Sequence, residues 1–299
     1  MEKEQLNDID QFHFGRERWI QRAGPVIRLS VEKGITGTRL EMSQNFNYFY
    51  TSAIKEGYAP LVIARHESHP DGFIIARLAL DLTVKTGELD PEFKGFLMPL
   101  AQSLEEGQQD RPIMRVYQEI KPTMRKFTLV PAPIVRKKDM REDVYAMKKD
   151  ADEELRMRNL LKEGYQGVVL FPEGTTTGGK TNEKGQVNGM VEFEENSIKK
   201  TYLFLKRNLK REVIFIPAAT FGGRRILNPD NKWVSPLSLL DALVSPYPTV
   251  ARIVVGDPIK SDDEYIKDLL KGKDQTGINK FLGREIASLI PENERGVYA

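Results

Sequence analysis

The chain has 299 residues, and its 45 lysines and arginines nearly balance 43 aspartates and glutamates. This balance gives no overall preference for nucleic acid or another polyanion as a partner. The chain contains no cysteine, which excludes disulfides, thiolate metal sites and a cysteine nucleophile. The length suffices for one large α/β domain, or for a domain with a helical extension.

Strand-like and helix-like segments alternate along most of the chain. The first fifty residues carry no strand signal, and we expect residues 1–58 to form an N-terminal helical extension that includes a helix over 39–56. Residues 59–299 then form the α/β domain. Short apolar runs predict buried strands at 60–64, 127–135, 167–171, 213–220 and 250–256, and helices are expected at 72–86, 142–163, 192–208 and 278–290. This alternation predicts a mixed, mostly parallel central sheet flanked by helices.

The first polar motif is segment 65–71 (RHESHPD), which follows the first predicted strand. Pro70 disfavours helix before it, so the segment is expected to be a turn that can bring Asp71 back to His66. An imidazole oriented by a carboxylate is a general base that can take the proton of an attacking alcohol. Two alternatives stay open, because Asp71 could simply cap the following helix and His69 could replace His66.

The second polar motif follows the strand at 167–171. There, segment 172–179 (PEGTTTGG) breaks the strand into a loop. Glu173 cannot easily belong to the core, because burying an unpaired carboxylate is costly. Gly174 permits close approach of a ligand to the backbone. The alternative interpretation is a plain glycine-rich turn.

Four segments together resemble the motifs of the glycerol-phosphate and lysophosphatidate acyltransferase family. His66 and Asp71 match the first motif, N-H-x-x-x-x-D, and residues 171–175 (FPEGT) match the third, F-P-E-G-T-R-S. Segment 213–218 (VIFIPA) is similar to the fourth motif, an apolar strand ending in proline, and segment 130–136 (VPAPIVR) is more loosely similar to the second. The resemblance extends from about residue 60 to residue 258.

The resemblance implies an O-acyltransferase of phospholipid synthesis. It would move a fatty acyl group from a thioester, of coenzyme A or of acyl carrier protein, to a hydroxyl of glycerol 3-phosphate or a lysophospholipid. His66 would be the general base and Asp71 would orient it, with no metal and no cofactor besides the thioester co-substrate. Backbone donors near Gly174 could steady the oxyanion. The expected substrate-binding residues are Arg136, Glu173, Gly174, Thr175, Arg224 and Arg225.

Two departures from the family pattern affect the expected acceptor. Arg65 replaces the usual asparagine before the histidine, and Thr176 replaces an arginine that would contact the acceptor phosphate. Arg136, Arg224 and Arg225 are the remaining phosphate partners, since a guanidinium fork suits phosphate geometry. For the arginines of segment 222–225 (GGRR), a solvated basic turn is the alternative.

Because the implied products are lipids, we expect contact with a membrane surface but no transmembrane span. No apolar stretch of about 20 residues exists, and residues 1–11 lack an apolar signal core, so a cytoplasmic or peripheral protein is expected. Segment 16–31 mixes arginines with apolar residues and could lie at an anionic interface, or pack on the body instead. Segment 233–247 could insert shallowly, or belong to the core.

Two other functions remain open. One is a metal-dependent hydrolase with His66, His69 and Asp71 as ligands. A catalytic zinc usually has three protein ligands plus water, and beyond these residues the chain offers only His13 as another histidine and no cysteine. The other is a non-catalytic acyltransferase-like protein that binds lipid. A serine hydrolase is disfavoured, because no G-x-S-x-G motif occurs.

Overall fold

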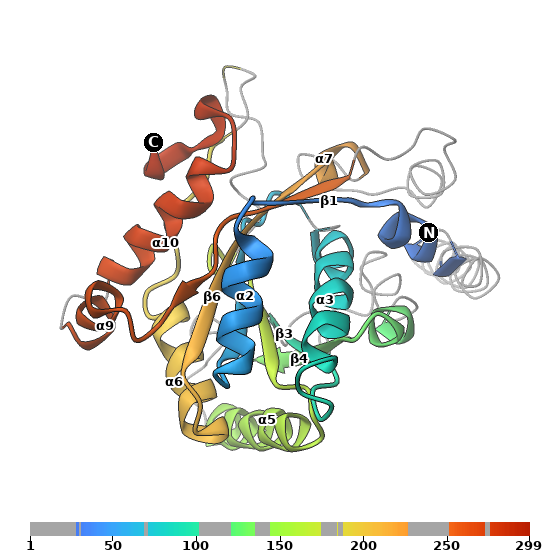
Figure 1. Cartoon of the computed structure of the whole chain (residues 1–299), viewed down its shortest axis with the longest axis vertical. Helices are drawn as coiled ribbons and strands as arrows, with labels where there is room; N and C mark the ends of the chain where they lie inside the picture. Colours follow the sequence, from blue (N-terminus) through green and yellow to red (C-terminus); the bar gives the residue numbers. More distant parts are fainter. Residues whose placement is uncertain are drawn as a thin grey trace, which may run out of the picture.

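The computed structural model describes residues 28–29, 31–68, 71–101, 121–134, 144–174, 184, 188–226, 251–272 and 276–299. Within these ranges the chain forms one central sheet with helices on both faces (Figure 1). The predicted α/β class with a mixed, mostly parallel sheet is thereby confirmed. No helix of the described ranges has the length and apolar character that crossing a membrane requires.

Parallel strands form the centre of the sheet. β2 (Ala59–Ala64) pairs in parallel with β5 (Gly167–Leu170) on one side and with β6 (Val213–Phe221) on the other. Beyond β5 the sheet continues with β3 (Phe96–Ala101) and then β4 (Leu129–Ile134), both parallel to their neighbours. These five strands all point the same way, so their carboxyl ends lie at one edge.

The other side of the sheet is mixed. β7 (Arg252–Val255) runs antiparallel to β6, and β1 (Arg39–Met42) pairs in parallel with β7 at the sheet edge. β8 (Ile259–Lys260) pairs antiparallel with the beginning of β6. The strand order is therefore β1-β7-β6-β2-β5-β3-β4, with β8 off this path.

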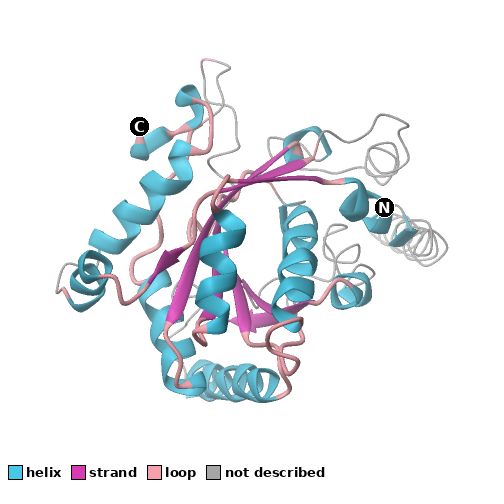
Figure 2. Ribbon diagram, in the orientation of Figure 1, coloured by secondary structure: helices cyan, strands magenta, loops and turns pink. Residues whose placement is uncertain are grey.

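Both faces of the sheet are covered by helices, which explains the continuous apolar runs of its central strands. All six residues of β2 are buried, with Val62 and Ala64 on one face and Leu61 and Ile63 on the other. The first face packs against α2 (Phe46–Lys55) and α3 (Asp71–Gly87). Figure 2 shows these two helices in front of the strands. The second face packs against α5 (Val144–Lys162), α6 (Ser197–Leu209), α9 (Glu264–Lys271) and α10 (Thr276–Ser288).

The N-terminal region agrees only in part with the helical extension expected for residues 1–58, since residues 31–37 are helical. The helix predicted over 39–56 is a strand, β1, followed by the shorter helix α2, and β1 belongs to the same sheet as β2. Residues 39–58 are therefore part of the α/β body. The error has a physical reason, because β1 is a short edge strand with partly exposed side chains, and its alternation of polar and apolar residues covers only four positions. Residues 1–27 lie outside the described ranges.

β3 was also not predicted, and it contains Pro99, a residue type that is unfavourable inside a sheet. The pairing of β3 with β5 extends only over Phe96 and Leu97, while the pairing with β4 continues to Ala101. Pro99 therefore lies beyond the end of the β5 ladder, where a missing N–H is tolerated.

The close pairing of β3 and β5 predicts a strict requirement for glycine at position 167. A Cβ on Gly167 would overlap the ring of Phe96. We expect Gly167→Ala to lower the free energy of unfolding by about 1–3 kcal/mol, as overpacking does. Gly34→Ala is the control, because a Cβ there meets nothing within 4 Å. Urea unfolding measures both variants, and equal stabilities would contradict the packing described.

Candidate active site

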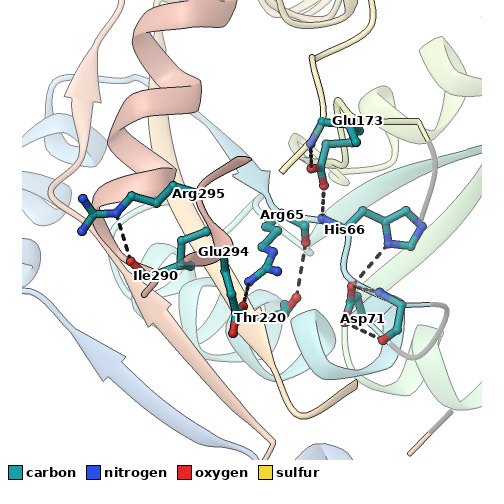
Figure 3. A network of polar contacts seen from close by, with 10 residues as sticks. Arg65, His66, Asp71, Glu173, Thr220, Ile290, Glu294 and Arg295 are labelled. Atoms are coloured by element: carbon teal, nitrogen blue, oxygen red, sulfur yellow. Dashed lines mark hydrogen bonds and ion pairs between the residues drawn. The ribbon is translucent and has the colours of Figure 1, made fainter. Parts of the chain in front are cut away.

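The two predicted polar motifs meet at one edge of the sheet. β2 and β5 are parallel neighbours, so the segments that follow Ala64 and Leu170 emerge side by side. Figure 3 shows His66 between Asp71, at the start of α3, and Glu173, in the turn after β5. In open α/β sheets, ligands bind in crevices outside the carboxyl ends of the strands.

His66 is oriented by the carboxylate of Asp71. The His66 Nδ1 and Asp71 Oδ2 atoms are 3.4 Å apart, at the long end of the hydrogen-bond range. The Asp71 side chain is fully buried, whereas that of His66 is 20% exposed. The second ring nitrogen, Nε2, forms no hydrogen bond with the described part of the chain. One ring nitrogen is therefore held by a buried carboxylate, and the other remains for a ligand.

Asp71 is itself fixed by the turn before α3. The Ser68 N–H donates to Asp71 Oδ2 over 2.7 Å, and the Ser68 hydroxyl donates to Oδ1 over 3.2 Å. The Asp71 side chain thus turns back towards His66 and the preceding loop. Its role is therefore not limited to capping α3. The loop after β6 also packs against Ser68 and Asp71, because a Cβ on Gly223 would overlap Ser68 Oγ and Asp71 Oδ1. Glycine at this position allows that close approach.

Glu173 holds the backbone of His66. The His66 N–H donates to Glu173 Oε2 over 2.6 Å, and the Val191 N–H donates to Oε1 over 3.0 Å. The Glu173 residue is only 3% exposed. Burial raises the pKa of Glu173 to about 7, against the lowering effect of these two N–H donors. Glu173 therefore ties two loops together, and its predicted contact with substrate stays a prediction.

The turn after β5 also supports the imidazole. The rings of Phe171 and His66 lie 4.8 Å apart between centroids, at an interplanar angle of 36°. Gly174 has φ +61°, a conformation that favours glycine. The Gly174 N–H donates to the Phe171 carbonyl over 3.1 Å. The Gly174 N–H is thus used within the turn, and the expectation that backbone donors near Gly174 could steady an oxyanion stays a prediction.

Arg65 forms a buried ion pair beside the histidine. It is 1% exposed, and its Nη1 lies 2.7 Å from Oε2 of Glu294, near the C-terminus. The Arg65 N–H donates to the Ala218 carbonyl over 3.1 Å, and the Thr220 hydroxyl donates to the Arg65 carbonyl over 3.3 Å. Both bonds attach Arg65 to β6. The chain is thus fixed to its neighbouring strand immediately before His66.

Glu67 adds an acidic group to the same edge. It is 7% exposed, and its Oε2 is buried without a hydrogen-bond partner among the described residues. Burial raises the pKa of Glu67 to about 7; Asp71 and Glu294 act in the same direction, while Arg65 and Arg224 oppose it. Arg224, on α7 (Gly223–Ile226), lies close enough to act electrostatically on Glu67, so this predicted residue is near the site.

The remaining predicted residues are only partly described. Arg136, Thr175 and His69 lie outside the described residues, and so does the side chain of Arg225. The three-ligand metal set of His66, His69 and Asp71 is therefore not placed. Among the described residues, no group of three potential ligands could hold a metal ion. Segment 233–247 and most of segment 16–31 are likewise outside the description.

Several site residues were not predicted to act there. Arg65 was noted only as a departure from the family motif, although an arginine directly after a buried strand was a signal of a buried charge. Glu294 lies 229 positions further along the chain, and no pattern around it marked the contact. Val191 acts through its main-chain N–H, and Ser68 acts through its N–H as well as its hydroxyl; side-chain motifs do not reveal main-chain donors.

Comparison with protein-family models and with curated protein sequences found no match for this chain. The chemical character of the site therefore comes from its residues. It combines an imidazole whose Nε2 has no partner among the described residues, a buried orienting carboxylate and a basic side chain nearby. Such an arrangement can remove a proton from a hydroxyl and stabilise the imidazolium that forms.

The buried carboxyl of Glu67 predicts a pH-dependent stability difference. Because its folded pKa of about 7 exceeds the ordinary value of 4.5, the folded state binds the proton more tightly, and Glu67 makes the protein less stable as pH rises between these values. We expect Glu67→Gln to gain stability relative to wild type over this window, by at most about 1.4 kcal/mol per pH unit. Urea unfolding at several pH values measures the difference.

Glu56→Gln is the control for the sign of this effect. The exposed Glu56 has a pKa lowered by its hydrogen bonds to Lys260 and Ser52. Its removal should therefore cost more stability as pH rises towards 4.5, and a constant amount across the window in which Glu67 changes. A Glu67→Gln difference that does not change with pH would show that the Glu67 carboxyl titrates normally in the folded protein.

Proposed function

We propose that the chain is an O-acyltransferase that moves a fatty acyl group from a thioester to a hydroxyl of glycerol 3-phosphate or a lysophospholipid. The observation that carries the proposal is the contact of His66 Nδ1 with the fully buried carboxylate of Asp71. The resemblance of segments 65–71 and 171–175 to the family motifs supplies the reaction type. Their meeting at the carboxyl edge of the sheet supports it.

In the proposed reaction, His66 acts as general base and then as general acid. Its Nε2 accepts the proton of the acceptor hydroxyl while the hydroxyl oxygen attacks the carbonyl carbon of the thioester. Asp71 keeps the proton on Nδ1 and stabilises the imidazolium. Collapse of the tetrahedral intermediate breaks the C–S bond, and the proton on Nε2 passes to the departing thiolate. The products are an ester and a free thiol, and no protein side chain is acylated.

A phosphate-bearing acceptor is favoured by the basic residue at the site. Arg224 acts electrostatically on Glu67, the residue after His66, and a guanidinium suits a phosphate. Arg136, Thr175 and Arg225 remain proposed substrate ligands. The donor is the thioester of coenzyme A or of acyl carrier protein. Because the products belong to phospholipid synthesis, we propose that the enzyme works in the cytoplasm at a membrane surface.

The proposal predicts a loss of thioester consumption when the pair is broken. We expect His66→Ala and Asp71→Asn each to lower kcat by a factor of about 10²–10⁴, because the general base is lost or held in the wrong tautomer. Release of free thiol from acyl-CoA and from acyl carrier protein, with glycerol 3-phosphate or lysophosphatidate as acceptor, measures the reaction.

Matched variants separate this mechanism from its alternatives. Asp81→Asn removes a partly buried carboxylate from the same helix, where its ion-pair partner among the described residues is Lys85, and should keep activity. If His69→Ala is inactive while His66→Ala is active, the assignment of the base is wrong. If wild type consumes no thioester, the catalytic proposal fails and a lipid-binding protein is favoured. A stoichiometric metal in active protein, removed together with activity by a chelator, would instead support the hydrolase.

A further inference from the structure

A C-terminal segment packs directly behind the site. This segment, residues 291–299, is called the strap and contains η4 (Glu292–Glu294) and η5 (Gly296–Tyr298). The Met190 N–H donates to the Glu294 carbonyl over 3.0 Å, and the Val297 N–H donates to the Met190 carbonyl over 3.1 Å. A Cβ on Gly189 would overlap the backbone of Gly296. The strap is therefore in close main-chain contact with segment 189–191.

A buried tyrosine anchors the far end of the strap. The Phe193 N–H donates to the hydroxyl of Tyr298 over 3.0 Å, and the two rings lie 5.0 Å apart between centroids. The Tyr298 ring also packs on α10, where a Cβ on Gly283 would overlap it. The strap is thus fixed along its length to the body of the protein.

The strap reaches His66 by two routes. The first runs through the neighbouring residue, because the carboxylate of Glu294 binds the guanidinium of Arg65, which directly precedes His66 (Figure 3). The second runs through segment 189–191, whose Val191 N–H binds Glu173, and Glu173 in turn accepts the N–H of His66. The two routes close a ring of contacts around the backbone that carries the imidazole.

The chemistry of Arg65 is poorly suited to a purely structural role. A buried ion pair commonly adds little stability compared with apolar residues of similar volume. In addition, Nη2 of Arg65 is buried without a hydrogen-bond partner among the described residues, which costs further stability. A group retained at such a cost next to the imidazole is more consistent with fixing geometry than with strengthening the fold.

We propose that the strap belongs to the catalytic apparatus, with Arg65 and Glu294 as positioning residues that set the orientation of His66. The inference rests on the proposed function for its kinetic consequence. Its structural content, the orientation of the imidazole, can be tested without any substrate.

The kinetic test compares Glu294→Gln with Asp90→Asn. The control breaks another partly buried ion pair, Arg211–Asp90, at the opposite end of β6. We expect Glu294→Gln to lower kcat between about tenfold and about a hundredfold with little change in KM, because misplacement of a catalytic group acts on the chemical step. Asp90→Asn should keep kcat even if it lowers Tm by as much as Glu294→Gln does.

The second test observes the imidazole directly by NMR. The chain has only three histidines, so His66→Ala identifies the His66 ring signals. We expect Glu294→Gln to shift or double the Cε1–Hε1 signal of His66 and to alter its tautomer balance, while Asp90→Asn leaves this signal unchanged. If Glu294→Gln fails to fold, Tyr298→Phe loosens the strap more gently and should change the same signal in the same direction.

The outcomes distinguish the two proposals. An unchanged His66 signal in the folded strap variants, or an unchanged kcat, overturns the positioning role. Equal losses of kcat in Glu294→Gln and Asp90→Asn overturn it too, because the effect would then follow stability alone. If wild type consumes no thioester, the proposed function fails, and the NMR comparison still decides whether the strap orients His66.

Discussion

The whole site depends on the position of β2 between β5, which ends beside it, and β6, which continues past its end. Ile63 is paired with Leu170 of β5, and Ala64 with Ala218 of β6, so both neighbours are present where β2 ends. The chain after Ala64 cannot leave the sheet freely, because β6 continues to Phe221 and binds the backbone of Arg65. His66 therefore emerges from a fixed point, with the loop after β5 on one side of it and the loop after β6 on the other.

The site concentrates ionisable groups in a place where water is largely excluded. Three of the buried ionisable groups there have a specific partner: Asp71 has Ser68, Glu173 has two main-chain N–H groups, and Arg65 has Glu294. The fourth, Glu67, has an Oε2 atom without a hydrogen-bond partner among the described residues. Removing one partner of a buried charge lowers the stability of the protein by more than the intact pair contributes to it. Such an arrangement defines one geometry well, although it contributes little to overall stability. This is the behaviour expected of a preorganised site rather than of a core.

Sequence patterns predicted the features that depend on local chemistry. Buried strands such as β2 and β6 are continuous apolar runs, and Pro70 marked the turn that returns Asp71 to His66. β1 and β3 were missed, because one is a partly exposed edge strand and the other contains a proline. The pairing of Arg65 with Glu294, 229 positions apart, follows only from the docking of the strap. Contacts made by main-chain N–H groups leave no trace in side-chain patterns.

Glu67 and Glu173 each have a pKa of about 7, so the site can take up and release protons near neutral pH. Near neutral pH each carries a proton in part of the molecules, so the site exchanges protons with the solvent. A negatively charged ligand bound beside Glu67 would raise the pKa of that carboxyl further, and its binding would therefore take up protons. Affinity for anions would then increase with acidity and decrease as the surroundings became alkaline.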